Sequence, residues 1–105
     1  MHQFFAYENR NPQSYKLYPF LLNVQSDLIE ETETRVVVPL YPLAHGRSPA
    51  MSSLSPVLEI EGNAYVLMTP LIAGLDINRL GQPIADLSHE RPAIMAALDL
   101  LISGI

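Results

Sequence analysis

One segment of this chain has the apolar spacing of an α-helix, and it lies near the C-terminal end. Across Ala93–Ile102, apolar residues recur every three or four positions, as on one broad face of a helix. Two spacings build this face: Ile94, Leu98, Leu101 and Ile105, and Met95, Leu98 and Ile102. The preceding residues carry short strand and turn patterns. The sequence therefore predicts a mainly β protein with a C-terminal α-helix.

The ends of this helix carry their own signals. Ser88 is suited to cap the N-terminus, and Glu90 in the first turn complements the helix dipole. Pro92 is tolerated only in that first turn, so the helix begins near it or a few residues later. Gly104 is a natural helix stop. The segment Ser103–Ile105 then either packs on the protein's own body or is kept for a partner.

The strand predictions are short and alternate with turn signals. The predicted strands are Gln3–Tyr7, Tyr15–Asn23 with Pro19 at an edge or bulge, Arg35–Leu40, Val57–Glu61 and Ala64–Thr69, and Leu71–Leu80 is either a weaker strand pair or a bent strand. The predicted turns are Glu8–Ser14, Gln25–Asp27, Gly62-Asn63 and Gly81–Pro83. The uninterrupted Val36–Val38 is typical of a strand covered on both faces. Tyr41–Pro56, with three prolines and four serines, is predicted to be a long loop.

Composition limits the class of protein. The 105 residues are 49% hydrophobic and 16% charged, which predicts a single globular domain over residues 1–105. The net charge is −5, with one lysine and five scattered arginines. Proteins that grip nucleic acid cluster basic residues, so we expect no direct nucleic-acid binding by this chain alone. No signal peptide or membrane-length apolar run is visible, so we expect a cytoplasmic protein without membrane association.

Candidate catalytic residues are sparse. His2, His45 and His89 lie too far apart for a local metal motif, and the chain has no cysteine. His45-Gly46-Arg47 combines residue types that serve RNA cleavage, but without a partner base in view. The acidic cluster of Glu30, Glu31 and Glu33 is more typical of a solvated loop than of a general acid/base pair. We therefore expect no enzyme activity, no catalytic residue, no metal and no cofactor.

An ordered set of short segments resembles the CcdB toxins of bacterial toxin–antitoxin operons. The set consists of Val24–Ile29, Arg35–Leu40, Met68-Thr69, Ala85–His89 and the terminal Gly104-Ile105. These segments occur in the same order and at similar spacing, across nearly the whole chain.

The resemblance implies an SH3-like β-barrel of the CcdB/MazF type, with a small accessory sheet and a C-terminal helix, assembled as a homodimer. It implies a toxin that binds the A subunit of DNA gyrase and traps the gyrase–DNA cleavage complex, which blocks replication. It also implies neutralisation by a CcdA-type antitoxin, whose complex with the toxin represses transcription of the operon.

The family's gyrase contacts carry over to six positions: Leu28, Ile29, Asp99, Ser103, Gly104 and Ile105. Two of them depart from the family pattern. Its best-known member has a Trp, which stacks on a gyrase arginine, where this chain has Ser103, and an Asn where this chain has Asp99. The role of the Tyr41–Pro56 loop and the antitoxin contacts are not assigned.

Two alternative functions remain open. One is a MazF-like ribonuclease toxin on the same barrel, although the acidic balance and the single lysine disfavour an RNA groove. The other is a non-toxic relative that only binds an antitoxin or a regulator, which the substitutions at Ser103 and Asp99 favour.

Overall fold

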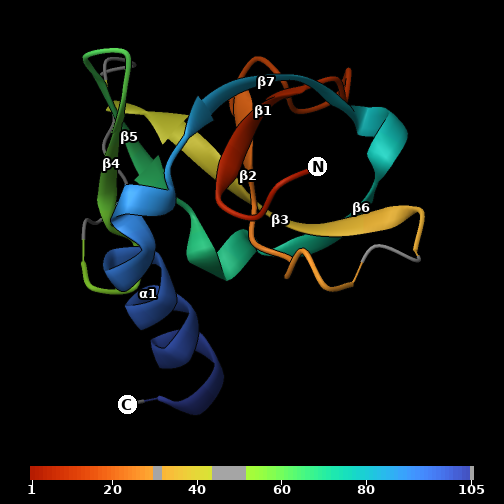
Figure 1. Cartoon of the computed structure of the whole chain (residues 1–105). Coiled ribbons are helices and arrows are strands. Elements are labelled where there is room, and N and C mark those ends of the chain that lie inside the picture. The colour runs from red at the N-terminus through yellow and green to blue at the C-terminus, as the bar shows by residue number, and fades with distance from the viewer. Residues whose placement is uncertain (30–31, 44–51, 105) are drawn as a thin grey trace.

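The protein is a curled antiparallel sheet with one helix at its C-terminal end (Figure 1). The computed structural model describes residues 1–29, 32–43 and 52–104. Its elements, with 3-10 helices labelled η, are β1 (Phe5–Asn9), β2 (Phe20–Asn23), β3 (Thr34–Pro42), β4 (Val57–Ile60), β5 (Asn63–Leu67), η2 (Thr69–Leu71), β6 (Ala73–Asp76), η3 (Ile77–Arg79), β7 (Leu80–Asp86), η4 (Ser88–Glu90) and α1 (Arg91–Ser103). The sheet order is β4-β5-β3-β2-β1-β7, and β6 also pairs with β3. The result is a half-barrel with a C-terminal helix, which confirms the predicted fold class.

Strand β3 is the central strand of this sheet. It pairs with β2 along its middle, with β6 near its start and with β5 at its end. Val38 and Leu40 pack into the larger core, whereas Val37 packs into a second cluster with Tyr7, Leu21 and Leu80. Burial of such side chains stabilises the fold by roughly 1.5–3 kcal/mol each. The prediction of a strand covered on both faces is confirmed for Val37 and Val38 but is wrong for Val36, whose side chain is exposed.

The hairpin β4–β5 extends the sheet beyond β3 and forms one of its edges. It confirms the hairpin predicted on either side of Gly62-Asn63, but its turn lies one residue earlier, at Glu61-Gly62. Both turn residues have left-handed backbone, with φ of 51° and 82°. Two-residue hairpin turns whose twist matches the strands require this conformation. Asn63 consequently joins β5, where it pairs with Ile60.

The predicted strand Tyr15–Asn23 is wrong over its first half, since only Phe20–Asn23 is extended. The chain before it folds into turns, in which Tyr18 N–H donates to the Ser14 carbonyl at 2.8 Å. The buried Asn9 side chain holds these turns by donating to Ser14 Oγ at 3.0 Å and to the Tyr18 carbonyl at 2.8 Å. Such side-chain bonds to nearby backbone compete with strand formation.

The predicted turn Gly81–Pro83 is also wrong, because these residues lie inside β7. Strand β7 is an edge strand with register shifts against β1, and an edge position tolerates a proline that cannot donate a hydrogen bond. At Gly81, an added Cβ would lie 2.7 Å from both Glu8 Oε1 and Arg10 Nε. The glycine therefore allows the side chains of Glu8 and Arg10 to lie close to the backbone of β7, and it does not form a turn.

The long loop predicted over Tyr41–Pro56 is shorter in the structure. Tyr41 and Pro42 complete β3, and Ser55 N–H donates to the Ser52 carbonyl at 3.1 Å in a tight turn. Residues 44–51 of this prediction lie outside the described residues. Within the described part of the chain, no helix has the length and hydrophobicity to cross a membrane.

The helix begins later than its predicted cap. Ser88 opens the 3-10 helix η4, and α1 begins at Arg91 without a side-chain cap, so Ser88 as its N-cap is wrong. The Ser88 N–H instead donates to the Asp86 carboxylate at 2.9 Å. Pro92 lies in the first turn of α1, as predicted. Gly104 ends the helix with φ of 75° and donates its N–H to the Leu100 carbonyl at 2.9 Å, which confirms the predicted stop.

Candidate functional site

The last turn of α1 is exposed, whereas the helix before it packs against the protein body. Ile94 and Ala97 near the start of the helix are buried, and Leu98 packs partly against the core. Ile102, one turn beyond Leu98, is 81% exposed. Figure 1 shows the helix leaving the sheet and projecting away toward its C-terminal end. The apolar face predicted for this helix is therefore covered at one end and uncovered at the other.

Three predicted site residues lie together on this free end. Asp99, Ser103 and Gly104 are all exposed. The Ser103 hydroxyl donates to the Asp99 carbonyl at 2.7 Å, so it is turned back onto the helix. Ile105 lies outside the described residues. The helix end offers a partner the apolar Ile102 and a small serine whose polar group is already bonded.

The other two predicted site residues lie on the loop after β2. Leu28 is 93% exposed and Ile29 is 55% exposed. The turn is closed by bonds from Ile29 N–H to the Ser26 carbonyl at 3.0 Å and from Leu28 N–H to Ser26 Oγ at 3.2 Å. These two adjacent side chains form a small exposed apolar surface at the end of the loop.

Gln25, at the start of this turn, fixes the loop to the sheet. Its side-chain nitrogen donates to the Ile29 carbonyl at 2.6 Å. Its side-chain oxygen accepts from Val36 N–H at 3.1 Å, on β3. At the other side of the loop, Gln3 N–H donates to the Asp27 carboxylate at 2.7 Å. Leu28 is therefore displayed by a braced turn, and the sequence showed only that Gln25–Asp27 would be a turn.

The helix end and the Leu28 loop are two separate surfaces in one chain. Among the described residues, no hydrogen bond joins the loop to α1. The structure groups Asp99, Ser103 and Gly104 on the helix end, and groups Leu28 with Ile29 on the loop after β2. Ile102 is not among the predicted contact residues, because its periodicity assigns it to the same apolar face as Ile94.

The described ionisable groups form no metal-binding arrangement. Among residues 1–29, 32–43 and 52–104, no three histidine or acidic side chains are placed to hold a metal ion. His2 and His89 are exposed, and the His2 ring lies 5.0 Å from the Phe5 ring. Glu30, Glu31, His45 and Arg47, from the predicted acidic cluster and RNA-cleaving motif, lie outside the described residues.

Asp86, at the end of β7, is the described acidic group with a lowered pKa. Hydrogen bonding from the Ser88 hydroxyl is the largest cause of its lowered pKa, followed by the Ser88 backbone N–H. The positive charges of His89 and His2 lower this pKa further. The Asp86 carboxylate accepts from the Ser88 N–H, at the start of η4. Asp86 is distant in sequence from both exposed apolar surfaces.

Comparison with known proteins identifies the family. A solved structure described as an endoribonuclease in complex with its cognate antitoxin, from Mycobacterial species, superposes with a TM-score of 0.73. The two chains share 16% identity, over 94% of this chain and 91% of that one, so this likeness shows the fold. A family model described as "CcdB protein" matches residues 3–104, which spans both exposed apolar surfaces. The chain therefore belongs to the CcdB family and is a toxin of a toxin–antitoxin system.

Proposed function

We propose that this toxin poisons DNA gyrase. In this proposal a homodimer binds the gyrase A subunit and traps the gyrase–DNA cleavage complex, so that replication is blocked. The observation that carries the proposal is the free end of α1, where Ile102 is exposed beside Ser103 and Gly104. The toxin acts by binding, without enzyme activity, catalytic residues or a cofactor.

The Leu28 loop supplies the second contact. Leu28 and Ile29 are exposed on a turn that Gln25 braces, so little ordering is needed when a partner binds. A two-fold dimer would present two copies of both surfaces, and a symmetric partner such as a gyrase dimer can engage both copies.

A cognate antitoxin is the second proposed partner. The solved endoribonuclease of the same fold is itself in complex with its cognate antitoxin. We propose that a CcdA-type antitoxin neutralises this toxin in the cytoplasm, and that their complex represses transcription of their operon. The toxin alone, with a net charge of −5, contributes no direct contact to nucleic acid in this scheme.

Ser103 sets the strength of poisoning. An aromatic anchor at this position would contribute a large share of the contact energy, and Ser103 instead bonds its own helix. Asp99 adds a negative charge to the same helix end. We therefore expect weaker gyrase binding than a toxin with an aromatic residue here achieves. Complete loss of poisoning would leave a protein that only binds its antitoxin or a regulator.

Deletion of Gly104 and Ile105 tests the proposal. Purified full-length toxin should make gyrase accumulate linear DNA from a supercoiled plasmid, and the truncated toxin should not. Gly104 is exposed, so the thermal unfolding midpoint should change little. Leu71→Ser, a change of an exposed apolar residue on η2, is the control and should still poison gyrase. If the folded, truncated toxin still traps gyrase on DNA, the proposal is wrong.

A ribonuclease toxin is the second candidate function, favoured by the fold shared with an endoribonuclease. It is tested by incubating the purified toxin with total RNA in the presence and absence of EDTA. If the toxin cleaves RNA at defined sites and has no effect on gyrase, its function is RNA cleavage and the proposal of gyrase poisoning is wrong.

A further inference from the structure

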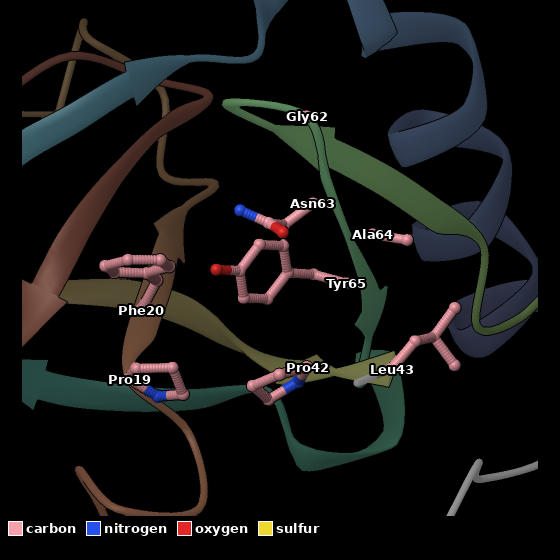
Figure 2. Close-up of a pocket in the computed structure, with 8 residues that line it drawn as sticks. All are labelled: Pro19, Phe20, Pro42, Leu43, Gly62, Asn63, Ala64 and Tyr65. Carbon is pink, nitrogen blue, oxygen red and sulfur yellow. The ribbon is translucent and has the colours of Figure 1, made fainter. Parts of the chain in front are cut away.

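An open pocket of about 610 Å³ lies between the start of β2, the end of β3 and the β4–β5 hairpin (Figure 2). Two aromatic rings and two prolines dominate its walls, and its lining residues are Pro19, Phe20, Pro42, Leu43, Gly62, Asn63, Ala64 and Tyr65. The rings of Phe20 and Tyr65 lie 5.4 Å apart between centroids and are inclined by 58°. The two rings are thus tilted toward each other and offer flat apolar surface.

The polar groups of the pocket come from one hairpin. Figure 2 shows the Tyr65 hydroxyl and the Asn63 side chain pointing to the same side, toward Phe20. Among the described residues, no hydrogen bond occupies the Tyr65 hydroxyl. The Asn63 side-chain nitrogen lies 3.5 Å from the Glu61 carbonyl, which leaves its side-chain oxygen as an acceptor. Both groups can therefore accept hydrogen bonds from a donor that enters the pocket.

The charge beside the pocket is negative. Glu61 is exposed in the hairpin turn, and its charge acts on Tyr65: burial, and then the Glu61 carboxylate, raise the pKa of the Tyr65 hydroxyl. The whole chain has a net charge of −5. An anionic ligand such as a nucleic-acid phosphate is disfavoured here, and a cation is favoured.

Of the cationic groups, guanidinium fits these features best. It is planar, it stacks on aromatic rings, and it carries several N–H donors in a fixed plane. We propose that this pocket binds an arginine side chain of a partner protein segment, with the guanidinium against Tyr65 and Phe20 and next to Glu61. The hairpin turn and the free end of α1 lie at opposite ends of the molecule in Figure 1. The pocket is therefore separate from the helix end that we propose binds gyrase.

A short peptide tests the pocket directly. Amide NMR spectra of the full chain are recorded during titration with acetyl-Gly-Arg-Gly-amide, and separately with the citrulline peptide, which has the same shape without the charge. We expect saturable shifts at Phe20 and at residues 62–65 with the arginine peptide, and none at residues 98–104. The citrulline peptide should bind at least several-fold more weakly.

Charge variants sharpen this test. Glu61→Gln should weaken the arginine peptide roughly threefold, as expected for an exposed ion pair. Glu33→Gln, a change of an exposed glutamate before β3, should leave the affinity unchanged. Equal binding of both peptides, or no saturable shift at the pocket, would overturn the proposal. Stronger shifts at the same residues with a short single-stranded oligonucleotide would overturn it in favour of a nucleic-acid site.

Discussion

Gln25 and Val36 are joined by a hydrogen bond in which the glutamine side-chain oxygen accepts from the valine backbone N–H at 3.1 Å. The side chain thereby supplies the acceptor for the Val36 amide, just beyond the end of the β2–β3 pairing. The same amide group holds the Ile29 carbonyl, so one residue connects the sheet to the exposed apolar turn. The display of Leu28 depends on this connection.

Gln25→Ala should loosen this turn with a modest loss of stability. Losing these bonds between part-exposed groups should cost about 1 kcal/mol in the free energy of unfolding. This corresponds to a decrease of roughly 4–8 °C in the unfolding midpoint for a domain of this size. The Val36 amide should exchange its hydrogen faster by NMR, because it loses its acceptor. Gln13→Ala, a change of an exposed glutamine in the turns before β2, should leave that exchange unchanged.

Leu28→Ser should separate stability from toxicity. Because Leu28 is nearly fully exposed, its loss should change the free energy of unfolding by less than about 0.5 kcal/mol. Growth arrest on expression without antitoxin should nevertheless be reduced. Leu58→Ala is the contrasting variant, since Leu58 is 1% exposed and its truncation should cost about 2–5 kcal/mol. If the folded Leu28→Ser variant arrests growth as strongly as the unchanged toxin, the Leu28 loop does not contact gyrase.

Ser103→Trp should strengthen gyrase binding. Ser103 is exposed at the end of α1, so a large ring fits without disturbing the core. A central aromatic anchor contributes about 2 kcal/mol or more, which corresponds to roughly a 30-fold gain in affinity. Binding to the purified gyrase A fragment measures the change. Ala96→Trp places the same ring at another exposed position of α1 and should give no comparable gain.

The lowered pKa of Asp86 predicts how the stability of the fold changes at acidic pH. Because the folded pKa lies below the ordinary aspartate value of 3.8, the ionised carboxylate stabilises the fold above that value. This contribution is lost as the pH falls through the folded pKa. Ser88→Ala should raise the Asp86 pKa, because hydrogen bonding from the Ser88 hydroxyl is the largest cause of the lowering. NMR titration of the Asp86 carboxyl carbon measures the change. His89→Gln should raise it less.

Glu61→Asn should stabilise the hairpin. Glu61 has φ of 51°, a left-handed conformation that costs most residues roughly 1 kcal/mol and that asparagine adopts readily. Asparagine followed by Gly62 is the favoured pair for such a two-residue turn. The unfolding midpoint should therefore increase by several degrees. Glu59→Asn, a change on the extended strand β4, is the control and should not increase it.

Local chemistry explains which elements could be predicted. The hairpin around Gly62, the strand through Val37 and Val38 and the helix stop at Gly104 each depend on residues adjacent in sequence. The predictions failed where contacts between residues that are not adjacent in sequence decided the conformation. Asn9 holds Tyr18 in turns, although the Tyr15–Asn23 run has strand composition. Pairing with β1 draws Gly81–Pro83 into a strand, although glycine and proline are typical of turns.

The sequence alone determined that a helix with a broad apolar face ends this chain, because spacings of three and four residues follow from helix geometry. It could not determine how much of that face is covered. Ile94 and Ile102 belong to the same face, yet one is fully buried and the other is 81% exposed. The tertiary structure decided this difference, because the core packs against Ile94 and Leu98 and leaves Ile102 exposed in the last turn. The apolar end that remains uncovered is the proposed gyrase contact.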